Sequence, residues 1–336
     1  MSRTKVELTP AEMEALAREA FGSSARITAC RPAQEGMYNA AYHLDLAGAG
    51  PDRAFLKVAP PDALEVLTYE RDLLRTETTL LRALTAAGVE AIPAVLAMDL
   101  TRRVVDRDCL FMQALDGVSL SGVRDQLDQD QRLSLRRQIG RIAATFGAVT
   151  APAFGYPGNP DLQAPTWGEA FRRITAALLA DARRFDAKLP LPLDEIAALF
   201  DAATPAFDDV TVARLTHFDL WDGNVLVRQG PDGWTVSGLV DWERAFFGDP
   251  LADIVCLTLF GSPAERDALL HALAEGGGPP QPDAEANRRL ALYRAYLWLV
   301  MIVEAGPRGF GGSILTPASA AARRLMRDLS IAATYS

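Results

Sequence analysis

The sequence has few cysteines, and their positions exclude two kinds of site. Cys30, Cys109 and Cys256 are far apart in a chain of 336 residues. An odd number of cysteines at these spacings forms neither a disulfide framework nor a cysteine metal site. We therefore interpret each cysteine as a small residue of the core.

Long hydrophobic runs are also lacking. The longest run, from Leu297 to Val303, ends at Glu304 and is far shorter than the roughly 18 residues that a membrane span needs. The N-terminus reads MSRTKVELTPAEME, which is charged and polar and does not resemble a signal peptide. We therefore predict a cytoplasmic protein that does not associate with membranes.

The sequence lacks a basic stripe, and lysine is scarce. The net charge is −9 and no segment gathers basic residues, which argues against nucleic acid as a partner. The excess of acidic residues either favours a cationic ligand or only keeps the protein soluble. Only three of the 34 lysine and arginine residues are lysines, so Lys57, which lies in a strand-like run, suggests a specific role. No segment indicates an obligate protein partner.

The first third of the chain has the pattern of a small sheet with one packed helix. Thr9 and Glu12 form a capping box, which predicts a helix that continues to about Phe21. A second helical pattern covers 64–88. Strand-like runs occupy 25–31, 39–47, 53–59, 94–100 and 108–115. The order of these runs predicts a mostly antiparallel sheet.

After residue 116 helical patterns dominate. They occur at 130–149, 167–187, 194–203, 250–260, 284–305 and 317–333. The strand signals there are short, and they surround residues 215–227. The change predicts an α+β fold of two lobes, in which 1–113 forms the sheet lobe, 114–116 the hinge and 117–336 the helical lobe.

Residues 215–227 read LTHFDLWDGNVLV and place polar side chains between two strand-like runs. His217, Asp219 and Asn224 fit the spacing H-x-D-x-x-x-x-N, which is that of the catalytic loop of protein kinases. Asp and Asn are also common in turns, so these residues taken alone fit a capped turn equally well. A His-x-Asp metal pair is a further alternative, but it needs another His or Cys ligand in a shared motif, and the sequence offers none.

Other parts of the sequence test the kinase interpretation. The strand pattern NVLVR, a turn and WTVSGLV lead directly to Asp241, at the place of a second metal-binding aspartate. Lys57 lies in the third strand-like run. The helical pattern after it contains Glu77, with Glu70 two turns earlier on the same face. A buried lysine needs an acidic partner, and either glutamate meets this requirement.

These motifs resemble those of the aminoglycoside phosphotransferase family, part of a kinase-like group that includes choline and fructosamine kinases. The family's catalytic loop resembles HFDLWDGNVLV, its metal-binding segment LVDWERAFFGDPLADI and its inter-lobe linker FMQALDG. The resemblance extends from about residue 30 to about residue 260. It implies a bilobal fold of the protein-kinase type, with ATP bound in the cleft between the lobes.

Departures from protein kinases favour a small-molecule acceptor. No G-x-G-x-x-G precedes the second strand-like run. Phe218 stands where protein kinases have the arginine that pairs with a phosphorylated activation loop. Asp249 follows Asp241 by only eight positions, which leaves too little chain for a segment that holds a protein substrate.

The resemblance assigns roles from the chemistry of phosphoryl transfer. Asp219 is expected to accept the proton of the acceptor hydroxyl. Asn224 and Asp241 are expected to bind Mg²⁺, a hard cation that prefers oxygen ligands. Lys57, held by Glu77, is expected to contact the α- and β-phosphates of ATP.

Backbone groups are expected to make the other nucleotide contacts. The N–H groups near Gly36 and Asn39 are expected to contact the phosphates. The backbone at Gln113 and Leu115 is expected to bind the adenine edge, in a slot lined by Met112. Any residue type carries the same backbone groups, so these assignments rest on position alone.

Three acidic residues have expected roles near the acceptor. Asp249 and Asp253 are expected to brace the catalytic loop through backbone hydrogen bonds, or alternatively to contact a cationic substrate. Glu304 is expected to reach a substrate amine if the helix at 284–305 forms a wall of the cleft.

The sequence therefore predicts an ATP- and Mg²⁺-dependent phosphotransferase that moves the γ-phosphate to a hydroxyl of a small molecule. The resemblance implies an aminoglycoside or another hydroxylated antibiotic as acceptor, and a role in resistance or self-protection. A metabolic kinase that acts on choline, fructosamine or a similar acceptor is the alternative. A non-catalytic nucleotide binder is a second alternative, but such a protein typically lacks Lys57, Asp219 or Asp241, and all three are present.

Overall fold

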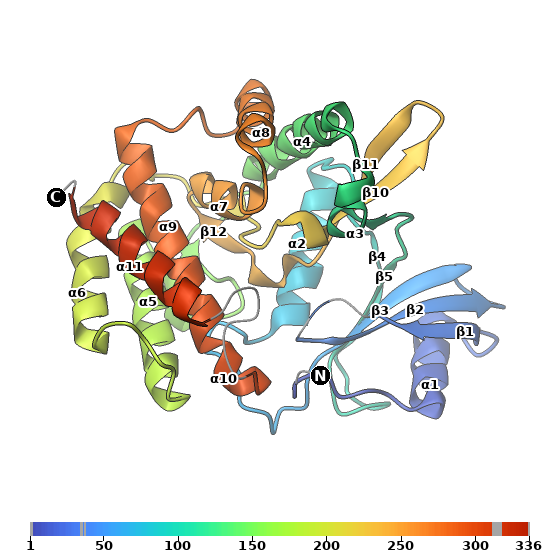
Figure 1. Cartoon of the computed structure of the whole chain (residues 1–336). Helices are drawn as coiled ribbons and strands as arrows, with labels where there is room; N and C mark the ends of the chain where they lie inside the picture. The colour runs from blue at the N-terminus through green and yellow to red at the C-terminus, as the bar shows by residue number, and fades with distance from the viewer. Residues whose placement is uncertain (1–2, 34–35, 37, 311–317, 335–336) are drawn as a thin grey trace.

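The computed structural model describes residues 3–33, 36, 38–310 and 318–334. Figure 1 shows a smaller part, built on the N-terminal sheet, and a larger part, which is mainly helical and contains the C-terminus. Helix α2 (Leu73–Ala86) contacts strand β4 of the smaller part and the η6 turn (Trp242–Arg244) of the larger part.

The smaller part is built on a five-stranded sheet in which all neighbouring strands are antiparallel. Its strands lie in the order β1 (Arg26–Pro32), β2 (Ala40–Ala47), β3 (Arg53–Val58), β5 (Cys109–Gln113) and β4 (Val95–Asp99). The five predicted strands are confirmed. Alternate residues of β2 and β3, such as Leu44 and Leu56, enter a core that α1 (Pro10–Phe21) covers, as the period of two in a strand requires.

Helix α2 begins at Leu73, so the prediction of one helix over 64–88 was wrong at its N-terminal end. Asp72 adopts the left-handed backbone conformation, with φ 50°, which a right-handed helix cannot contain. The preceding residues, 66–72, form an irregular segment whose polar groups bind the larger part. Tertiary hydrogen bonds therefore override the helical pattern of apolar residues there.

The segment 66–72 joins the two parts a second time, in addition to residues 114–116. Thr68 donates its backbone N–H and its hydroxyl to the carboxylate of Asp181, at 2.6 and 2.9 Å. The carbonyl oxygen of Thr68 accepts a hydrogen bond from the side-chain amide of Asn159 at 3.0 Å. The chain between β3 and α2 is therefore fixed to the larger part.

The larger part is organised around α9, whose residues are buried along most of its length. Its helices are α3 (Leu120–Val123), α4 (Gln129–Ala144), α5 (Trp167–Arg184), α6 (Leu193–Ala203), α7 (Asp253–Leu257), α8 (Pro263–Glu275), α9 (Ala284–Val303), α10 (Ala305–Arg308) and α11 (Ala318–Thr334). Apart from their ends, the predicted helices are confirmed. The pattern at 250–260 forms only the short α7, and α8 was not predicted.

Short strands in the larger part hold the polar stretch at 215–227. They are β6 (Val118–Ser119), β7 (Phe154–Gly155), β8 (Gln163–Ala164), β9 (Arg214–Thr216), β10 (Val225–Gly230), β11 (Gly233–Leu239) and β12 (Phe246–Gly248). Strand β9 precedes the stretch and the β10–β11 hairpin follows it. The N–H of Val240 donates to the carbonyl oxygen of Asn224 at 3.0 Å, so the hairpin returns Asp241 to the side of the stretch.

In the part of the chain that the structure describes, one helical stretch, Ala284–Arg308, is long and apolar enough to cross a membrane by length and composition. Within the protein, 83% of its apolar window is buried. Helices α5 and α11 pack against it. We therefore interpret the stretch as the core of the larger part.

Candidate active site

The polar stretch forms a loop between β9 and the η5 turn (Asp222–Asn224), and buried groups fix its shape. Phe218 is buried and adopts the left-handed conformation with φ 55°, which is uncommon for a bulky residue. Its backbone N–H donates to Oδ1 of Asp253 at 2.8 Å. The expectation that Asp253 braces the loop is therefore confirmed.

Two other acidic residues bind elsewhere than expected. The carboxylate of Asp249 accepts from Arg289 and Tyr293 of α9 at 3.0 and 2.8 Å, and so braces a helix rather than the loop. Glu304 is buried and accepts from Nη2 of Arg244 at 2.6 Å, so an arginine already occupies the place that was expected for a substrate amine.

Asp219 lies on the outer side of the loop, where 19% of its side chain is exposed. Its carbonyl oxygen accepts from Nδ2 of Asn224 at 2.8 Å, which closes the loop. Burial raises the pKa of the Asp219 carboxyl to about 7. Arg244, with Nε 3.7 Å from Oδ2, opposes this rise, and Asp241 adds to it. A carboxyl with a pKa near neutrality is suited to accept a proton from a hydroxyl group.

His217 connects the loop to the end of the hairpin and is fully buried. Its Nδ1 accepts from the backbone N–H of Asp219 at 3.3 Å, so its Nε2 carries the proton that is donated to the carbonyl oxygen of Val240, at 3.2 Å. Burial lowers the pKa of the imidazole to about 4, which keeps the ring neutral. His217 is therefore a structural residue beneath Asp219.

Lys57 of β3 connects the two walls of the cleft. Its Nζ donates to both carboxylate oxygens of Glu77, at 2.8 and 2.9 Å, and to Oδ1 of Asp241 at 2.7 Å. Burial opposes the charge on Lys57, but Asp241 and Glu77 outweigh it and raise the pKa of the ammonium group. Of the two candidate glutamates, Glu77 is the partner of Lys57, because Glu70 accepts from Arg308 at 2.6 Å.

Asp241 owes its orientation to its backbone. It adopts the left-handed conformation, with φ 71°, directly after the β10–β11 hairpin. The next N–H, that of Trp242, donates to Oε1 of Glu77 at 3.2 Å. Burial opposes the charge on Asp241, but Lys57 outweighs it and holds the pKa of the carboxyl below its ordinary value.

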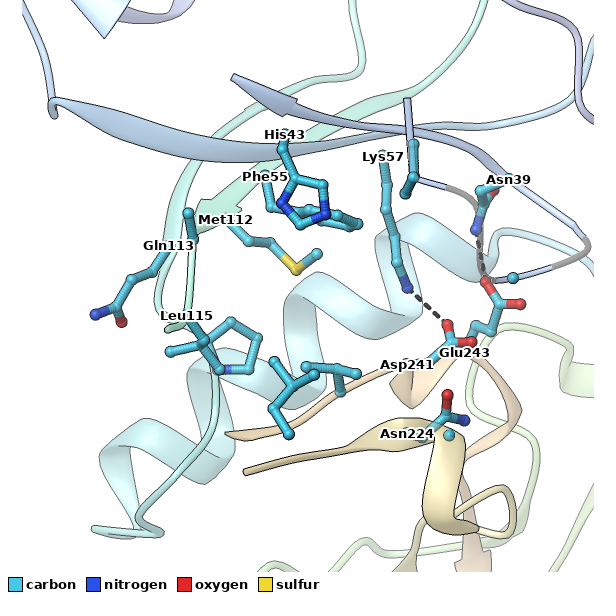
Figure 2. A pocket seen from close by; sticks show the side chains of 18 of the residues that line it. Asn39, His43, Phe55, Lys57, Met112, Gln113, Leu115, Asn224, Asp241 and Glu243 are labelled. Atoms are coloured by element: carbon cyan, nitrogen blue, oxygen red, sulfur yellow. Dashed lines mark hydrogen bonds and ion pairs between the residues drawn. The ribbon is translucent and has the colours of Figure 1, made fainter. Parts of the chain in front are cut away.

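Most of the predicted site residues line one cleft between the two parts. Figure 2 shows Lys57 and Asn39 on one wall, facing Asp241 and Glu243, with Asn224 close by on the opposite wall. The lining includes Gly36, Asn39, Lys57, Gln113, Leu115, Asn224 and Asp241. Glu77 lies behind Lys57, and Asp219 lies on the loop that carries Asn224 rather than in the cleft lining.

The residues expected to contact the phosphates have different surroundings. Gly36 is exposed and adopts φ 80°, a conformation that favours glycine. Residue 37, which falls in the same expectation, lies outside the described residues. Asn39 donates Nδ2 to Oε2 of Glu243 at 2.5 Å, and its buried Oδ1 has no hydrogen-bond partner among the described residues. Phosphate contact by these residues stays a prediction.

Two residues that line the apolar part of the cleft were not predicted from the sequence. His43 and Phe55 lie directly opposite each other on β2 and β3, and their rings contact at 4.9 Å between centroids. Figure 2 shows them with Met112 between Lys57 and Gln113, where they line the cleft. A signal was present, because Phe55 precedes Lys57 by two positions and therefore faces the same side of the sheet.

A sequence model of the phosphotransferase enzyme family matches residues 29–293. The chain belongs to this family. No curated protein matches the sequence at a significant level. Asp219, Asn224 and Asp241 lie within the matched range, as do Lys57 and Glu77.

Solved structures of this fold include proteins with different acceptors. A protein assigned as a fructosamine-3-kinase from Thermobifida fusca is 21% identical, with a TM-score of 0.67 over 97% of this chain and 100% of the other. A thermostable aminoglycoside phosphotransferase APH(4)-Ia in complex with AMP-PNP and hygromycin B is 19% identical, with a TM-score of 0.64 over 96% and 99%. A macrolide 2'-phosphotransferase from Brachybacterium faecium is 19% identical, with a TM-score of 0.57 over 93% and 97%.

At these identities the likeness shows the fold, and it confirms the predicted α+β bilobal architecture of the kinase type. Together with the family match, it makes this protein a small-molecule phosphotransferase.

Proposed function

We propose that this phosphotransferase moves the γ-phosphate of ATP to a hydroxyl of a small molecule, in a reaction that requires Mg²⁺. The observation that supports this most directly is the contact between Lys57 and Asp241 at 2.7 Å. It puts a cation suited to phosphates and an anion suited to a metal in one cleft, and Asp219 lies on the adjoining loop. Positioning and electrostatics of this kind account for most of the catalysis of phosphoryl transfer.

Asp241 and Asn224 fit a Mg²⁺ ion that is bound together with ATP. The side-chain amide of Asn224 donates its Nδ2 to Asp219 and leaves Oδ1 as a ligand for the ion. Within the described residues, no group of three or more His, Cys, Asp or Glu side chains is arranged to hold a metal by itself. This suits Mg²⁺, which takes most of its ligands from phosphate oxygens and water. When bound, the ion supplies positive charge to the phosphate oxygens.

The remaining roles belong to side chains of the chain itself. Asp219 accepts the proton of the acceptor hydroxyl and directs its oxygen towards the γ-phosphate. Lys57 binds the α- and β-phosphates, and Glu77 holds its ammonium group in place. Glu77 is fully buried, and within the described residues its carboxylate accepts from Lys57 and from the N–H of Trp242.

The adenine ring belongs at the apolar end of the cleft, beside the strand β5 and the residues after it. The N–H of Gln113 already donates to the carbonyl oxygen of Ala94 at 2.8 Å. The carbonyl oxygen of Gln113 and the N–H of Leu115 are therefore assigned to the adenine edge. Phe55 and Met112 supply the apolar contacts.

We further propose that residues 1–113 form the nucleotide-binding lobe, 114–116 the hinge and 117–336 the lobe that carries the acceptor site. Backbone N–H groups near Gly36 would contact the phosphates. A location in the cytoplasm, where ATP is available, is part of the same proposal.

Two classes of acceptor have support. The relatives that bind hygromycin B or act on macrolides support an aminoglycoside or another hydroxylated antibiotic, and a role in resistance or self-protection. The Thermobifida protein supports a fructosamine as a metabolic acceptor. Choline is the other metabolic acceptor that the sequence motifs leave open. The phosphoryl-transfer chemistry is the same in both, so the acceptor site must decide between them.

The test is a coupled assay of ADP formation with purified protein, Mg·ATP and a panel of hydroxylated acceptors. Acceptor-dependent turnover that requires Mg²⁺ is expected, and Asp219→Ala should abolish it while Mg·ATP still binds. Full turnover by Asp219→Ala would refute the proton-acceptor role. Turnover that is insensitive to Lys57→Met and Asp241→Asn would contradict the proposed site as a whole.

A further inference from the structure

A cluster of polar side chains, all buried except the half-buried Arg244, lies beside Asp219, outside the lining of the nucleotide cleft. Its members come from three distant parts of the chain and are Tyr69, Glu70, Arg244, Glu304 and Arg308. Arg244 donates to Glu304 and Arg308 to Glu70, both at 2.6 Å. Arg308 also lies 3.5 Å from Glu304, which links the two pairs. The four charged members therefore balance one another.

Among the residues that the structure describes, three donor groups of this cluster have no hydrogen-bond partner: the hydroxyl of Tyr69 and the Nε and Nη1 of Arg308. The exposed fractions of the two residues are only 5% and 3%. Buried donors without partners cost folding free energy, and in native proteins each one calls for an explanation. A guanidinium group can only donate, so the missing partner has to be an acceptor of hydrogen bonds. An ammonium group cannot fill this place.

The cluster adjoins the position of the reacting hydroxyl. Nε of Arg244 lies 3.7 Å from Oδ2 of Asp219, and 14% and 19% of the two side chains are exposed. A hydroxyl that gives its proton to Asp219 has to lie within hydrogen-bond distance of that carboxylate. The exposed sides of Asp219 and Arg244 form an open edge. Substituents a few atoms from the hydroxyl therefore meet Arg244 at this open edge. Arg308 shares the carboxylate of Glu304 with Arg244, at 3.5 and 2.6 Å, and Tyr69 precedes Glu70, the other partner of Arg308.

The two glutamates of the cluster do not favour a cationic acceptor. Each is bound by an arginine, and an amine would have to displace that arginine into a buried space to reach them. Removing one partner of a buried ion pair leaves an uncompensated charge, which costs far more than an exposed pair contributes.

We propose that the acceptor of this phosphotransferase carries a carboxylate close to the hydroxyl that is phosphorylated. Arg244 binds this carboxylate at the open edge, and the unpaired donors of Tyr69 and Arg308 complete its hydrogen bonds. The inference rests on the proposed function and narrows its acceptor class from hydroxylated molecules in general to hydroxy acids and uronic acids. Polycationic aminoglycosides are disfavoured.

Matched acceptors test the charge preference. Glucuronate, glucose and glucosamine share a sugar ring, and glycerate, glycerol and 3-amino-1,2-propanediol form a smaller set. We expect kcat/KM for the carboxylate of each set to exceed that for the amine by at least about tenfold, as a hydrogen bond to a charged group implies. A preference for the amines or for kanamycin, or no preference, overturns the inference but leaves the proposed function intact. If Mg·ATP does not bind in a direct titration, the proposed function itself has failed, and the inference fails with it.

Two tyrosine variants test the site without removing a charge. The Tyr69 and Tyr156 rings are stacked at 5.3 Å between centroids. The hydroxyl of Tyr156 contacts that of Tyr296 at 3.0 Å, whereas that of Tyr69 has no partner in the described part of the chain. Tyr69→Phe should leave Tm unchanged or raise it, and should raise KM for glucuronate about tenfold. Tyr156→Phe should lower Tm and leave that KM unchanged. If Tyr69→Phe lowers Tm and leaves KM unchanged, the inference is overturned.

Arg244 provides a third arm of the test. Arg244→Gln should raise KM for glucuronate more than tenfold and leave KM for Mg·ATP unchanged, and Arg244→Lys should restore part of the loss. An equal rise in KM for glucose and glucuronate would indicate a purely structural role and overturn the assignment.

Discussion

The ammonium group of Lys57 lies 2.7 Å from Oδ1 of Asp241, although 184 positions separate the two residues in the chain. This contact joins the sheet of the smaller part directly to the segment that follows the β10–β11 hairpin of the larger part. Glu77 accepts hydrogen bonds from Lys57 and from the N–H of Trp242, the residue after Asp241. The ammonium group of Lys57 therefore fixes the relative position of β3, α2 and the segment that contains Asp241.

Lys57→Met should both destabilise the protein and abolish turnover. It leaves Glu77 fully buried without its cation, and breaking a buried pair costs about 3 kcal/mol or more in the free energy of unfolding. Urea denaturation measures this loss. The double variant Lys57→Met/Glu77→Gln should recover most of the stability but none of the activity. Recovery of activity in the double variant would show that Lys57 serves only as a partner for Glu77.

Asp219→Asn should separate catalysis from folding. An amide cannot accept the proton, so kcat should fall by roughly 10²- to 10⁴-fold. The Tm should stay the same or rise, since burial already disfavours the charge of Asp219. Calorimetric titration with Mg·ATP should give an affinity close to that of the unaltered protein. A large drop in Tm would instead indicate that Asp219 serves mainly to hold the loop together.

The pH dependence of turnover should follow Asp219. Burial raises the pKa of its carboxyl to about 7, and only the ionised form accepts a proton. Below that pH the ionised fraction falls about tenfold per pH unit, so kcat/KM should decline with the same slope from pH 7 towards pH 5. Circular dichroism over the same range serves as the control for folding. A flat profile from pH 5 to pH 8 would be incompatible with this role.

Asp222 should be essential for the shape of the catalytic loop. It is buried and accepts from Arg124 and Arg136, at 2.5 and 2.9 Å. Asp222→Asn should therefore lower the free energy of unfolding by about 3 kcal/mol and raise the Mg²⁺ concentration needed for half-maximal activity. Asp267→Asn is a matched control, because its contact with Arg266 is exposed and should contribute less than about 0.5 kcal/mol. Similar losses in the two variants would argue against a role of burial.

The sequence predicted the residues that follow a fixed spacing. His217, Asp219 and Asn224 occupy one loop, and the hairpin after it leads to Asp241, so their proximity is local. The role of Lys57 could be predicted because its strand is the third of a small sheet. These interpretations required no knowledge of side-chain contacts between the two parts.

Contacts between distant segments could not be predicted in the same way. Glu70 and Arg308 are 238 positions apart, and no local pattern relates them. The start of α2 was also missed, because the carboxylate of Asp181 determines the conformation of Thr68 from another element. Helix α8 is a different case, since Ser262 caps it, Pro263 follows, and this signal was overlooked.

The hydrogen bonds of Thr68 to Asp181 have a consequence for the catalytic cycle. A lobe attached to its neighbour by one covalent connection can rotate about it, but here the segment just before α2 forms a second attachment. Swinging the sheet away from the helices therefore requires these hydrogen bonds to break. If the protein uses ATP as proposed, ADP leaves either through a cleft of nearly constant width or after Thr68 detaches. On the second route the rate of detachment sets an upper limit on turnover.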